Sequence, residues 1–208
     1  MKTKRKIIFC ALVGGAALFT GAAPAAEDEF KFMPKGGREM FVEVLAGCSN
    51  CDNIATVVTT QGTQEDWLKY FSGRQSSLKS PAGDRKKGAL ANLGDKQTKT
   101  LLSYLAVNTP ISKDKLPKDA KKINWTALLP LDGRQLTLEK CMGCHSIGVT
   151  VLNEADYKGW GMIMRKSDHV VIRMTEKETE TLKQYLAANM PLPEDQVPKA
   201  LRQSSGTY

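Results

Sequence analysis

Two halves of this sequence repeat one another, and the repeat limits the possible folds more than any other feature. A C-x-x-C pair and a tryptophan recur at a longer offset (141 − 48 = 93), in the pairs Cys48 with Cys141, Cys51 with Cys144 and Trp67 with Trp160. Residues 100–106 recur as residues 181–187 at a shorter offset (181 − 100 = 81), as do Asn108 with Asn189, Pro110 with Pro191 and Pro117 with Pro198. The difference between the offsets (93 − 81 = 12) predicts an insertion in the first half, within residues 75–88. We therefore expect two copies of one structural unit.

The second C-x-x-C pair carries the most specific chemical signal. Cys141, Cys144 and His145 form the sequence C-x-x-C-H, the attachment signature of c-type haem. Two thiols on one helical turn can each bond to a haem vinyl group, and the next residue then lies beneath the iron. We expect covalent haem at Cys141 and Cys144, with His145 as the proximal iron ligand. The alternatives are a chance match, a thioredoxin-like dithiol and a zinc half-site, which would need a second Cys or His pair nearby.

The sixth iron ligand should follow this motif in the chain. A methionine thioether suits low-spin haem iron, and ligation by His and Met raises the reduction potential. Met174 stands just before a helical run at residues 176–187, which is similar to the position of the distal ligand in small class I cytochromes c. Met174 is therefore the expected ligand, although it could instead be a core residue. Met162, Met164, Met190 and His169 are the other candidates.

The first repeat lacks both of the expected iron ligands. Asp52 takes the place of His145 at the longer offset, and Leu93 takes the place of Met174 at the shorter one. A site that has lost both ligands no longer needs iron, and Leu93 can fill the space of a haem edge. We therefore predict one haem c per chain.

The N-terminus has the pattern of a secretory signal peptide. Residues 2–6 include four basic side chains, residues 7–23 form an apolar run, and residues 23–25 are small enough for cleavage. A transmembrane anchor would need about 20 apolar residues, and Cys10 lies too early in the run to be a lipid anchor. We expect cleavage after residue 25 and an exported protein, for example a periplasmic one, without a transmembrane anchor.

Export to an oxidising compartment permits disulfides as well as covalent haem attachment. Cys48 and Cys51 are therefore expected to form a short disulfide. A redox-active dithiol and haem held without a histidine ligand are the alternatives for this pair.

The positive charge of the chain is uneven. The sequence has 30 Lys and Arg against 22 Asp and Glu; removal of residues 1–25 takes away four bases, so 30 − 4 = 26 bases remain and the net charge falls from +8 to +4. Residues 26–130 hold 16 bases and 12 acids, and residues 131–208 hold 10 of each. The predicted insertion contributes Arg85, Lys86 and Lys87. We interpret this basicity as a docking face for an acidic redox partner protein rather than as a nucleic-acid site, with a solvated basic face as the alternative.

The hydrophobic pattern predicts an all-α fold. Apolar residues at helical spacing indicate helices at residues 38–46, 95–107 and 175–188. We expect two tandem cytochrome c-like helical domains, at residues 26–118 without haem and at residues 119–208 with haem, after a signal peptide at residues 1–25.

At this level the sequence resembles a tandem class I-like c-type cytochrome. The C-x-x-C-H motif, the Gly159-Trp160 segment, Arg173-Met174 and a Glu-rich helix ending in Tyr-Leu-Ala are similar to the dihaem cytochrome domain of quinohemoprotein amine dehydrogenase α subunits. The resemblance implies an electron-transfer role and covers most of the mature chain as a repeat plan. It implies no amine substrate, because the catalytic machinery of that enzyme lies in other domains and another subunit.

These observations lead to one functional expectation and two alternatives. The chain is expected to be an exported mono-haem electron carrier, or the electron-transfer subunit of a larger oxidoreductase complex, with no catalytic residues of its own. The first alternative is a structural or docking subunit that uses the basic first repeat as a binding module. The second is a haem enzyme such as a peroxidase, which would need an open distal position.

Overall fold

The computed structural model describes residues 29–46, 52–73, 90, 93–118, 123–169 and 171–202. The chain separates into two units, Met1–Lys31 and Phe32–Tyr208, and only residues 29–31 of the first unit are described. Apart from residues 26–31, both predicted domains therefore lie within the second unit. The predicted signal peptide, Cys48 and Cys51, and the basic cluster at residues 85–87 fall outside the described residues.

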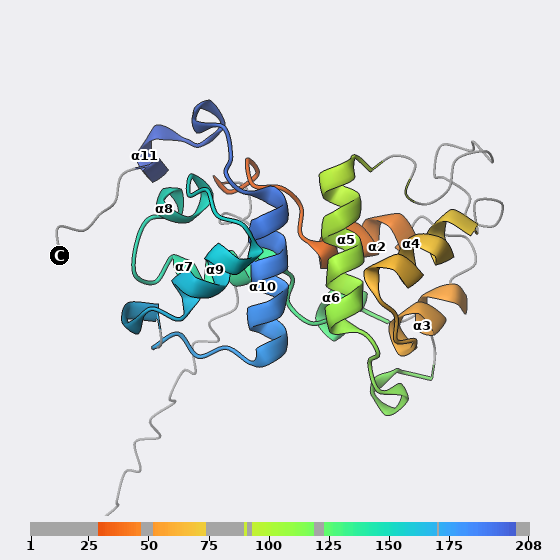
Figure 1. Ribbon diagram of the computed structural model, residues 1–208. Helices are drawn as coiled ribbons and strands as arrows, with labels where there is room; N and C mark the ends of the chain where they lie inside the picture. The colour runs from red at the N-terminus through yellow and green to blue at the C-terminus, as the bar shows by residue number, and fades with distance from the viewer. Residues whose placement is uncertain are drawn as a thin grey trace, which may run out of the picture. The chain divides into compact units, whose positions relative to one another are not determined.

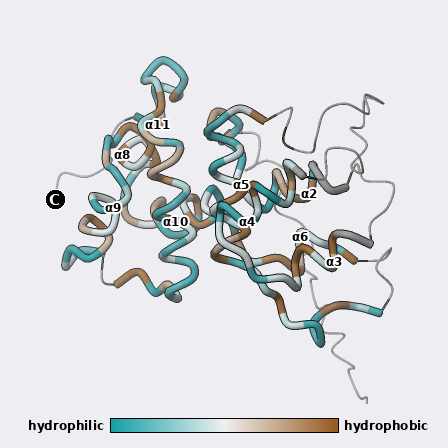
Figure 2. Tube along the Cα trace, turned by 45° about the vertical axis from the view of Figure 1, so that its right-hand side comes forward, coloured by the Kyte–Doolittle hydropathy of each residue, from teal (hydrophilic) through white to brown (hydrophobic). Residues whose placement is uncertain are grey.

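All regular secondary structure in the described residues is helical, which confirms the all-α prediction. The helices of the first half are α2 (Gly37–Ala46), α3 (Asp52–Thr59), α4 (Gln64–Gly73), α5 (Asp95–Asn108), η1 (Lys113–Lys115) and α6 (Trp125–Leu128). Those of the second half are α7 (Gly133–Cys141), α8 (Ile147–Val151), α9 (Tyr157–Met164), η3 (Ser167–His169), α10 (Glu176–Asn189), η4 (Glu194–Gln196) and α11 (Lys199–Arg202). The three helices predicted from periodicity correspond to α2, α5 and α10, and Figure 2 shows hydrophilic and hydrophobic residues alternating along the helices.

The order of helices recurs at the offsets found in the sequence. α5 and α10 are both 14 residues long. The shorter offset relates their first residues (176 − 95 = 81) and their last residues (189 − 108 = 81). The longer offset relates the first residues of α4 and α9, Gln64 and Tyr157. α2 and α7 begin at Gly37 and Gly133 (133 − 37 = 96), so their offset exceeds that of the C-x-x-C pairs by three. The structure thus pairs two helices that the sequence comparison did not match.

A glycine allows close contact between α2 and α5 in the first repeat, and another allows it between α7 and α10 in the second. A Cβ atom at Gly37 would lie 2.1 Å from the Cβ of Tyr104, and a Cβ atom at Gly133 would lie 2.0 Å from the Cβ of Tyr185. Only glycine permits this approach, because any larger side chain would push α2 away from α5, or α7 away from α10.

The two repeats meet where α5 packs against α10 (Figure 1). The Asn108 side chain donates from Nδ2 to Oγ1 of Thr181 at 2.9 Å, and Asn189 donates in the same way to Thr100 at 2.8 Å. All four side chains are buried. The pairs are reciprocal, since each repeat supplies one amide and one hydroxyl, and buried polar groups that satisfy each other in this way fix one relative position of the helices.

Two tyrosines tie the helices to neighbouring segments. The Tyr104 hydroxyl donates to the carbonyl of Pro130 at 2.8 Å, and the Tyr185 hydroxyl donates to the carbonyl of Pro34 at 2.7 Å. Burial raises the pKa of both phenols well above the usual value of about 10. Both hydroxyls therefore stay neutral donors at neutral pH.

Asp132 caps helices of both repeats with one buried carboxylate. Its Oδ1 accepts a hydrogen bond from the backbone of Gln135 at 3.1 Å and so caps α7. Its Oδ2 accepts from the backbone of Arg38 at 3.1 Å and of Glu39 at 3.3 Å, at the start of α2. A Cβ at Gly36 would lie 2.1 Å from the Asp132 carboxyl carbon, so glycine at this position lets the cap reach α2. A carboxylate is favourable at both helix N-termini.

The core of the first repeat extends beyond the boundary predicted from the sequence. Leu129 belongs to the apolar cluster formed by α2 to α5, and Trp125 packs against that cluster. The segment 125–129 thus packs with the first repeat, whereas the predicted domain boundary lies after residue 118. The division of the chain into two cytochrome-like domains remains a prediction.

Candidate functional site

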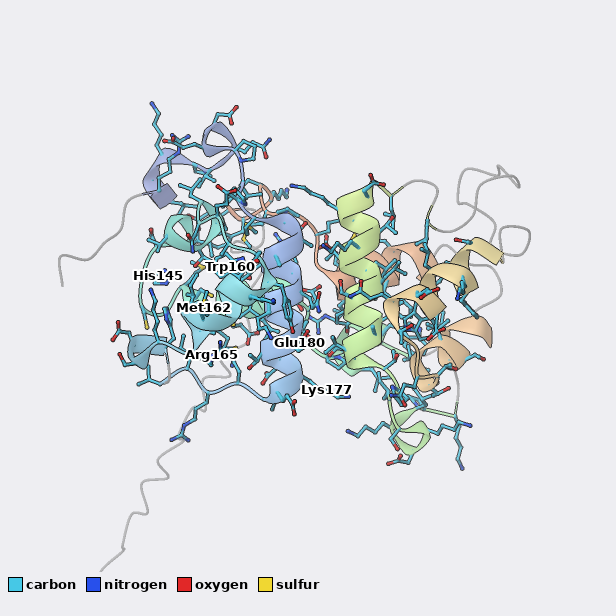
Figure 3. All side chains as sticks on the ribbon, in the orientation of Figure 1. His145, Trp160, Met162, Arg165, Lys177 and Glu180 are labelled. Atoms are coloured by element: carbon cyan, nitrogen blue, oxygen red, sulfur yellow. The ribbon has the colours of Figure 1, made fainter. Side chains whose placement is uncertain are left out.

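The second repeat contains a largely apolar pocket. Its walls come from the C-terminal end of α7, from α8 and α9, from the turn around η3 and from α10. It encloses about 700 Å³ of space, a volume that includes its open mouth. Figure 3 shows His145, Trp160 and Met162 gathered around α9.

The pocket brings together most of the residues predicted as haem ligands. Cys141, His145 and Met174 all line it, although α8, α9 and η3 separate Met174 from Cys141 in the chain. Cys144 is exposed and lies one turn after Cys141. An imidazole and a thioether are donors that suit haem iron, and the Cys141 thiol lies on the wall of the same apolar pocket.

The structure separates the alternative candidates for the sixth ligand. Met164 and His169 also line the pocket, so both remain alternatives to Met174. Met162 is 61% exposed and does not line the pocket, and Met190 is buried elsewhere. Since α9 turns Met162 outward while its neighbour Ile163 lines the pocket, Met162 is not positioned to reach a bound cofactor.

The imidazole of His145 is oriented by the backbone. Its Nδ1 lies 3.1 Å from the carbonyl oxygen of Ser146, and the geometry suits donation from Nδ1–H to that oxygen. In that tautomer Nε2 carries no proton and is available as a ligand. Metal-ligating histidines commonly donate their second ring nitrogen in this way, which fixes both the ring and the tautomer.

The two thiols of the motif are not bonded to each other. Burial raises the pKa of the Cys141 thiol to about 11, against a smaller opposing effect from its hydrogen bond with Thr150. A redox-active dithiol needs a lowered thiol pKa to present a thiolate at neutral pH. The environment of Cys141 therefore does not favour the thioredoxin-like alternative.

Two buried nitrogen atoms in the pocket wall have no hydrogen-bond partner among the described residues. They are Nε1 of Trp160, whose side chain is 3% exposed, and Nδ1 of His169. A buried donor without an acceptor costs about 1–3 kcal/mol. A cofactor with carboxylate groups can offer acceptors to such atoms, although Trp67, the counterpart of Trp160 in the first repeat, also has a buried Nε1 without a partner among the described residues.

In the first repeat, aromatic side chains take two of the positions that line the pocket in the second. At the two offsets of the repeat the replacements are Val57 for Thr150, Tyr70 for Ile163, Phe71 for Met164 and Leu93 for Met174. Phe71 is 1% exposed and makes an edge-on contact with Tyr70, with ring centroids 5.3 Å apart. Leu93 packs against the same apolar core. Two aromatic rings thus stand where the second repeat has an aliphatic side chain and a thioether.

A second, more polar recess adjoins the pocket. It shares Met164, His169, Ile172 and Met174 with the pocket and is otherwise lined by polar or small residues, which include Arg165, Thr179 and Lys183. The Lys183 ammonium is held by Glu180 at 2.9 Å and by the Tyr157 hydroxyl at 2.8 Å. The Met174 side of the pocket therefore faces a basic, water-accessible surface.

Trp160 and Thr150 could not be identified as pocket residues from the sequence alone. Trp160 was visible as a repeated position, but repetition alone does not distinguish a core residue from a pocket residue. Thr150 gave no signal, since only the structure places its hydroxyl beside the Cys141 thiol.

No family model, curated protein or solved structure matches this chain. Within the described residues, His, Cys, Asp and Glu side chains nowhere gather in a group of three or more that could hold a metal ion. None of the described helices combines the length and apolar character that crossing a bilayer requires.

Proposed function

We propose that this chain is an exported mono-haem c-type cytochrome that transfers electrons, as a shuttle or as a subunit of a larger oxidoreductase complex. The observation that carries the proposal is the convergence of Cys141, His145 and Met174 on one apolar pocket. The C-x-x-C-H spacing supports it independently, as does the signal-peptide pattern of residues 1–25.

Five residues have a role in this proposal. Cys141 and Cys144 would hold the haem through thioether bonds, and Nε2 of His145 and the thioether of Met174 would bind its iron. The indole N–H of Trp160 could donate to a polar group of the cofactor. Bound haem would supply reversible one-electron exchange at its iron. The apolar walls exclude water, which, together with His and Met ligation, favours a high reduction potential.

The first repeat is proposed to hold no haem. Its sequence lacks both ligands, and Tyr70, Phe71 and Leu93 occupy the positions that line the pocket in the second repeat. In this proposal the first repeat is a structural partner of the haem repeat, and the C-x-x-C pair at Cys48 and Cys51 forms a disulfide.

The haem content of the purified chain tests the proposal. A pyridine haemochrome assay should give one covalent haem per chain, and Cys141→Ala with Cys144→Ala should abolish it. The matched variant, Cys48→Ala with Cys51→Ala, should keep one haem. Two haems per wild-type chain would contradict an empty first repeat, and none would contradict the cytochrome itself. The methionine-to-iron charge-transfer band of the ferric protein should disappear in Met174→Ala and persist in Met164→Ala.

A docking subunit is the second candidate function. Lys113, Lys115 and Lys118 of the first repeat are all exposed, and a basic surface of this kind suits an acidic protein partner. In that case the haem would pass electrons within a larger complex or would have no remaining function. Stable co-purification with a large oxidoreductase would distinguish this function from that of a free electron shuttle.

A further inference from the structure

Two large apolar side chains are exposed beside the pocket. Met162 is 61% exposed and Val171 is 74% exposed. Their neighbours in the chain, Ile163 and Ile172, line the pocket. The same two short segments therefore present one apolar side chain to the pocket and the next to solvent.

Four basic side chains lie within a few positions of these two apolar residues in the chain. Lys158, Arg165, Lys166 and Arg173 are all exposed, and none of them forms an ion pair with another described residue. Lys158, Met162 and Lys166 are spaced four positions apart along α9 and the turn that follows it, so they share a side of this segment. We call the set of six residues the distal rim: Lys158, Met162, Arg165, Lys166, Val171 and Arg173.

The backbone holds the distal rim in one compact stretch. Successive turns connect Arg165 to Met162, Lys166 to Ile163, His169 to Lys166 and Ile172 to His169 through backbone hydrogen bonds of 2.9–3.2 Å. Arg165 also lines the polar recess that Met174 and Met164 share. A molecule bound to the distal rim would thus lie next to the Met174 side of the pocket.

Charge separates the two segments that carry the proposed iron ligands. Residues 158–174, which include Met174, have four bases and one acid, a net charge of 4 − 1 = +3. Residues 139–156, which include His145, have one base and three acids, a net charge of 1 − 3 = −2. The neutral total of the second half therefore conceals an uneven distribution of charge along the chain, and the bases of residues 158–174 would attract a negatively charged surface.

We infer that the distal rim is the docking surface for an acidic redox partner protein, with Met162 and Val171 as the apolar centre of the contact. This inference rests on the proposed function and moves the expected docking face from the basic first repeat to the haem repeat. Small apolar centres surrounded by charge are typical of transient protein contacts. An anionic membrane is a weaker fit, because α9 has only eight residues and membrane-surface helices present a long amphipathic face.

Charge reversal in the holo-protein tests this inference against the first repeat. Arg165→Glu, Lys166→Glu and Arg173→Glu together reverse three exposed bases, and Lys113→Glu, Lys115→Glu and Lys118→Glu are the matched control with the same change in net charge. The probe is an acidic flavodoxin, whose reduced form donates one electron to the haem in stopped-flow experiments. The distal-rim variant should react at least about tenfold more slowly at low salt, with a smaller difference at high salt. The control should change less than about twofold.

A binding measurement makes the test independent of electron transfer. Oxidised flavodoxin titrated into isotope-labelled holo-protein should shift the backbone amide signals of Met162 and Val171, and Met162→Ala with Val171→Ala should weaken binding at every salt concentration. Equal slowing of both charge-reversal variants, or amide shifts confined to the first repeat, would overturn the inference. It would also be overturned if the distal-rim variant lost binding to phosphatidylglycerol vesicles while its reaction with flavodoxin was unchanged. Failure of the proposed function differs from all of these, because no variant would then contain haem.

Discussion

In the first repeat Phe71 is buried in the apolar core, whereas its counterpart in the second repeat, Met164, is half-buried and lines a pocket. The helices around the two residues are nearly the same in length and order. The side chains that hold these helices together also match, since Leu101 and Leu105 of the first repeat are as buried as Leu182 and Leu186 of the second. The repeats therefore differ in what the helices enclose rather than in how the helices pack.

This difference shows which positions of the unit are independent of a cofactor. The contacts of Gly37 and Gly133 with the tyrosines depend only on helix crossing, and both are kept. Two positions that line the pocket change in volume, since Ile163 and Met164 are replaced by Tyr70 and Phe71. A repeat without a cofactor must fill the space with its own side chains, because an empty cavity of that size would be costly.

The largest expected effect comes from truncating Phe71 and its counterpart Met164. Phe71→Ala should lower the free energy of unfolding by about 3–5 kcal/mol, because it leaves a cavity in a filled core. Met164→Ala should cost no more than about 1 kcal/mol, because Met164 is half-buried and already borders open space. Urea denaturation of the two variants measures both values. Equal costs would mean that the two repeats are filled in the same way.

The next effect concerns the cap that the repeats share. Asp132→Ala should cost about 2–3 kcal/mol, because the start of α2 and the start of α7 both lose acceptors, and each cap contributes about 0.5–2 kcal/mol. Thr175→Ala is the matched control, since Thr175 caps α10 alone, and should cost about 1 kcal/mol. Denaturation curves compare the two. A cost for Asp132→Ala no larger than that of the control would show that one of its two caps contributes nothing.

A smaller effect tests the reciprocal contacts between α5 and α10. Asn108→Ala and Asn189→Ala should each cost about 1–2 kcal/mol, because each removes a buried amide that donates to a threonine hydroxyl and to a backbone carbonyl. The two costs should agree within about 0.5 kcal/mol if the interface is symmetric. Gln184→Ala, which removes a hydrogen bond to Glu180 near the surface, should change stability by less than about 0.5 kcal/mol. Unequal costs for the two asparagine substitutions would show that the interface between α5 and α10 is not energetically symmetric.

The smallest effect appears at alkaline pH. The pKa of Tyr104 and of Tyr185 is raised by burial from the ordinary value of 10.0, so below that pH the phenols are neutral in both the folded and the unfolded chain. Above it the unfolded chain loses protons that the folded chain retains, and stability falls. At about pH 10.5 the loss should be about 0.8 kcal/mol per tyrosine. Tyr104→Phe and Tyr185→Phe should each remove one tyrosine's contribution to this loss of stability at high pH. An unchanged dependence of stability on pH in both variants would contradict the prediction.

Much of the helical plan could be predicted from the sequence. The ends of these helices carry local signals: Thr175 and Glu178 form a capping box at the start of α10, and α5 and α10 end at Asn108 and Asn189, each two residues before a proline. The pairing of α2 with α7 was not visible, because Gly37 precedes Cys48 by more positions (48 − 37 = 11) than Gly133 precedes Cys141 (141 − 133 = 8). Glycine contacts of this kind are set by helix packing and leave no periodic signal.

The sequence by itself determined the duplication, the helical class and the C-x-x-C-H motif with its expected ligands, because each of these depends on residue type and spacing along the chain. Only the tertiary structure decided that Met174, Met164 and His169 reach one pocket while Met162 faces solvent, and that Phe71 and Tyr70 occupy the corresponding space in the first repeat. The physical reason is that pocket and core depend on how helices from distant parts of the chain pack together. Neither charge totals nor periodicity records that packing.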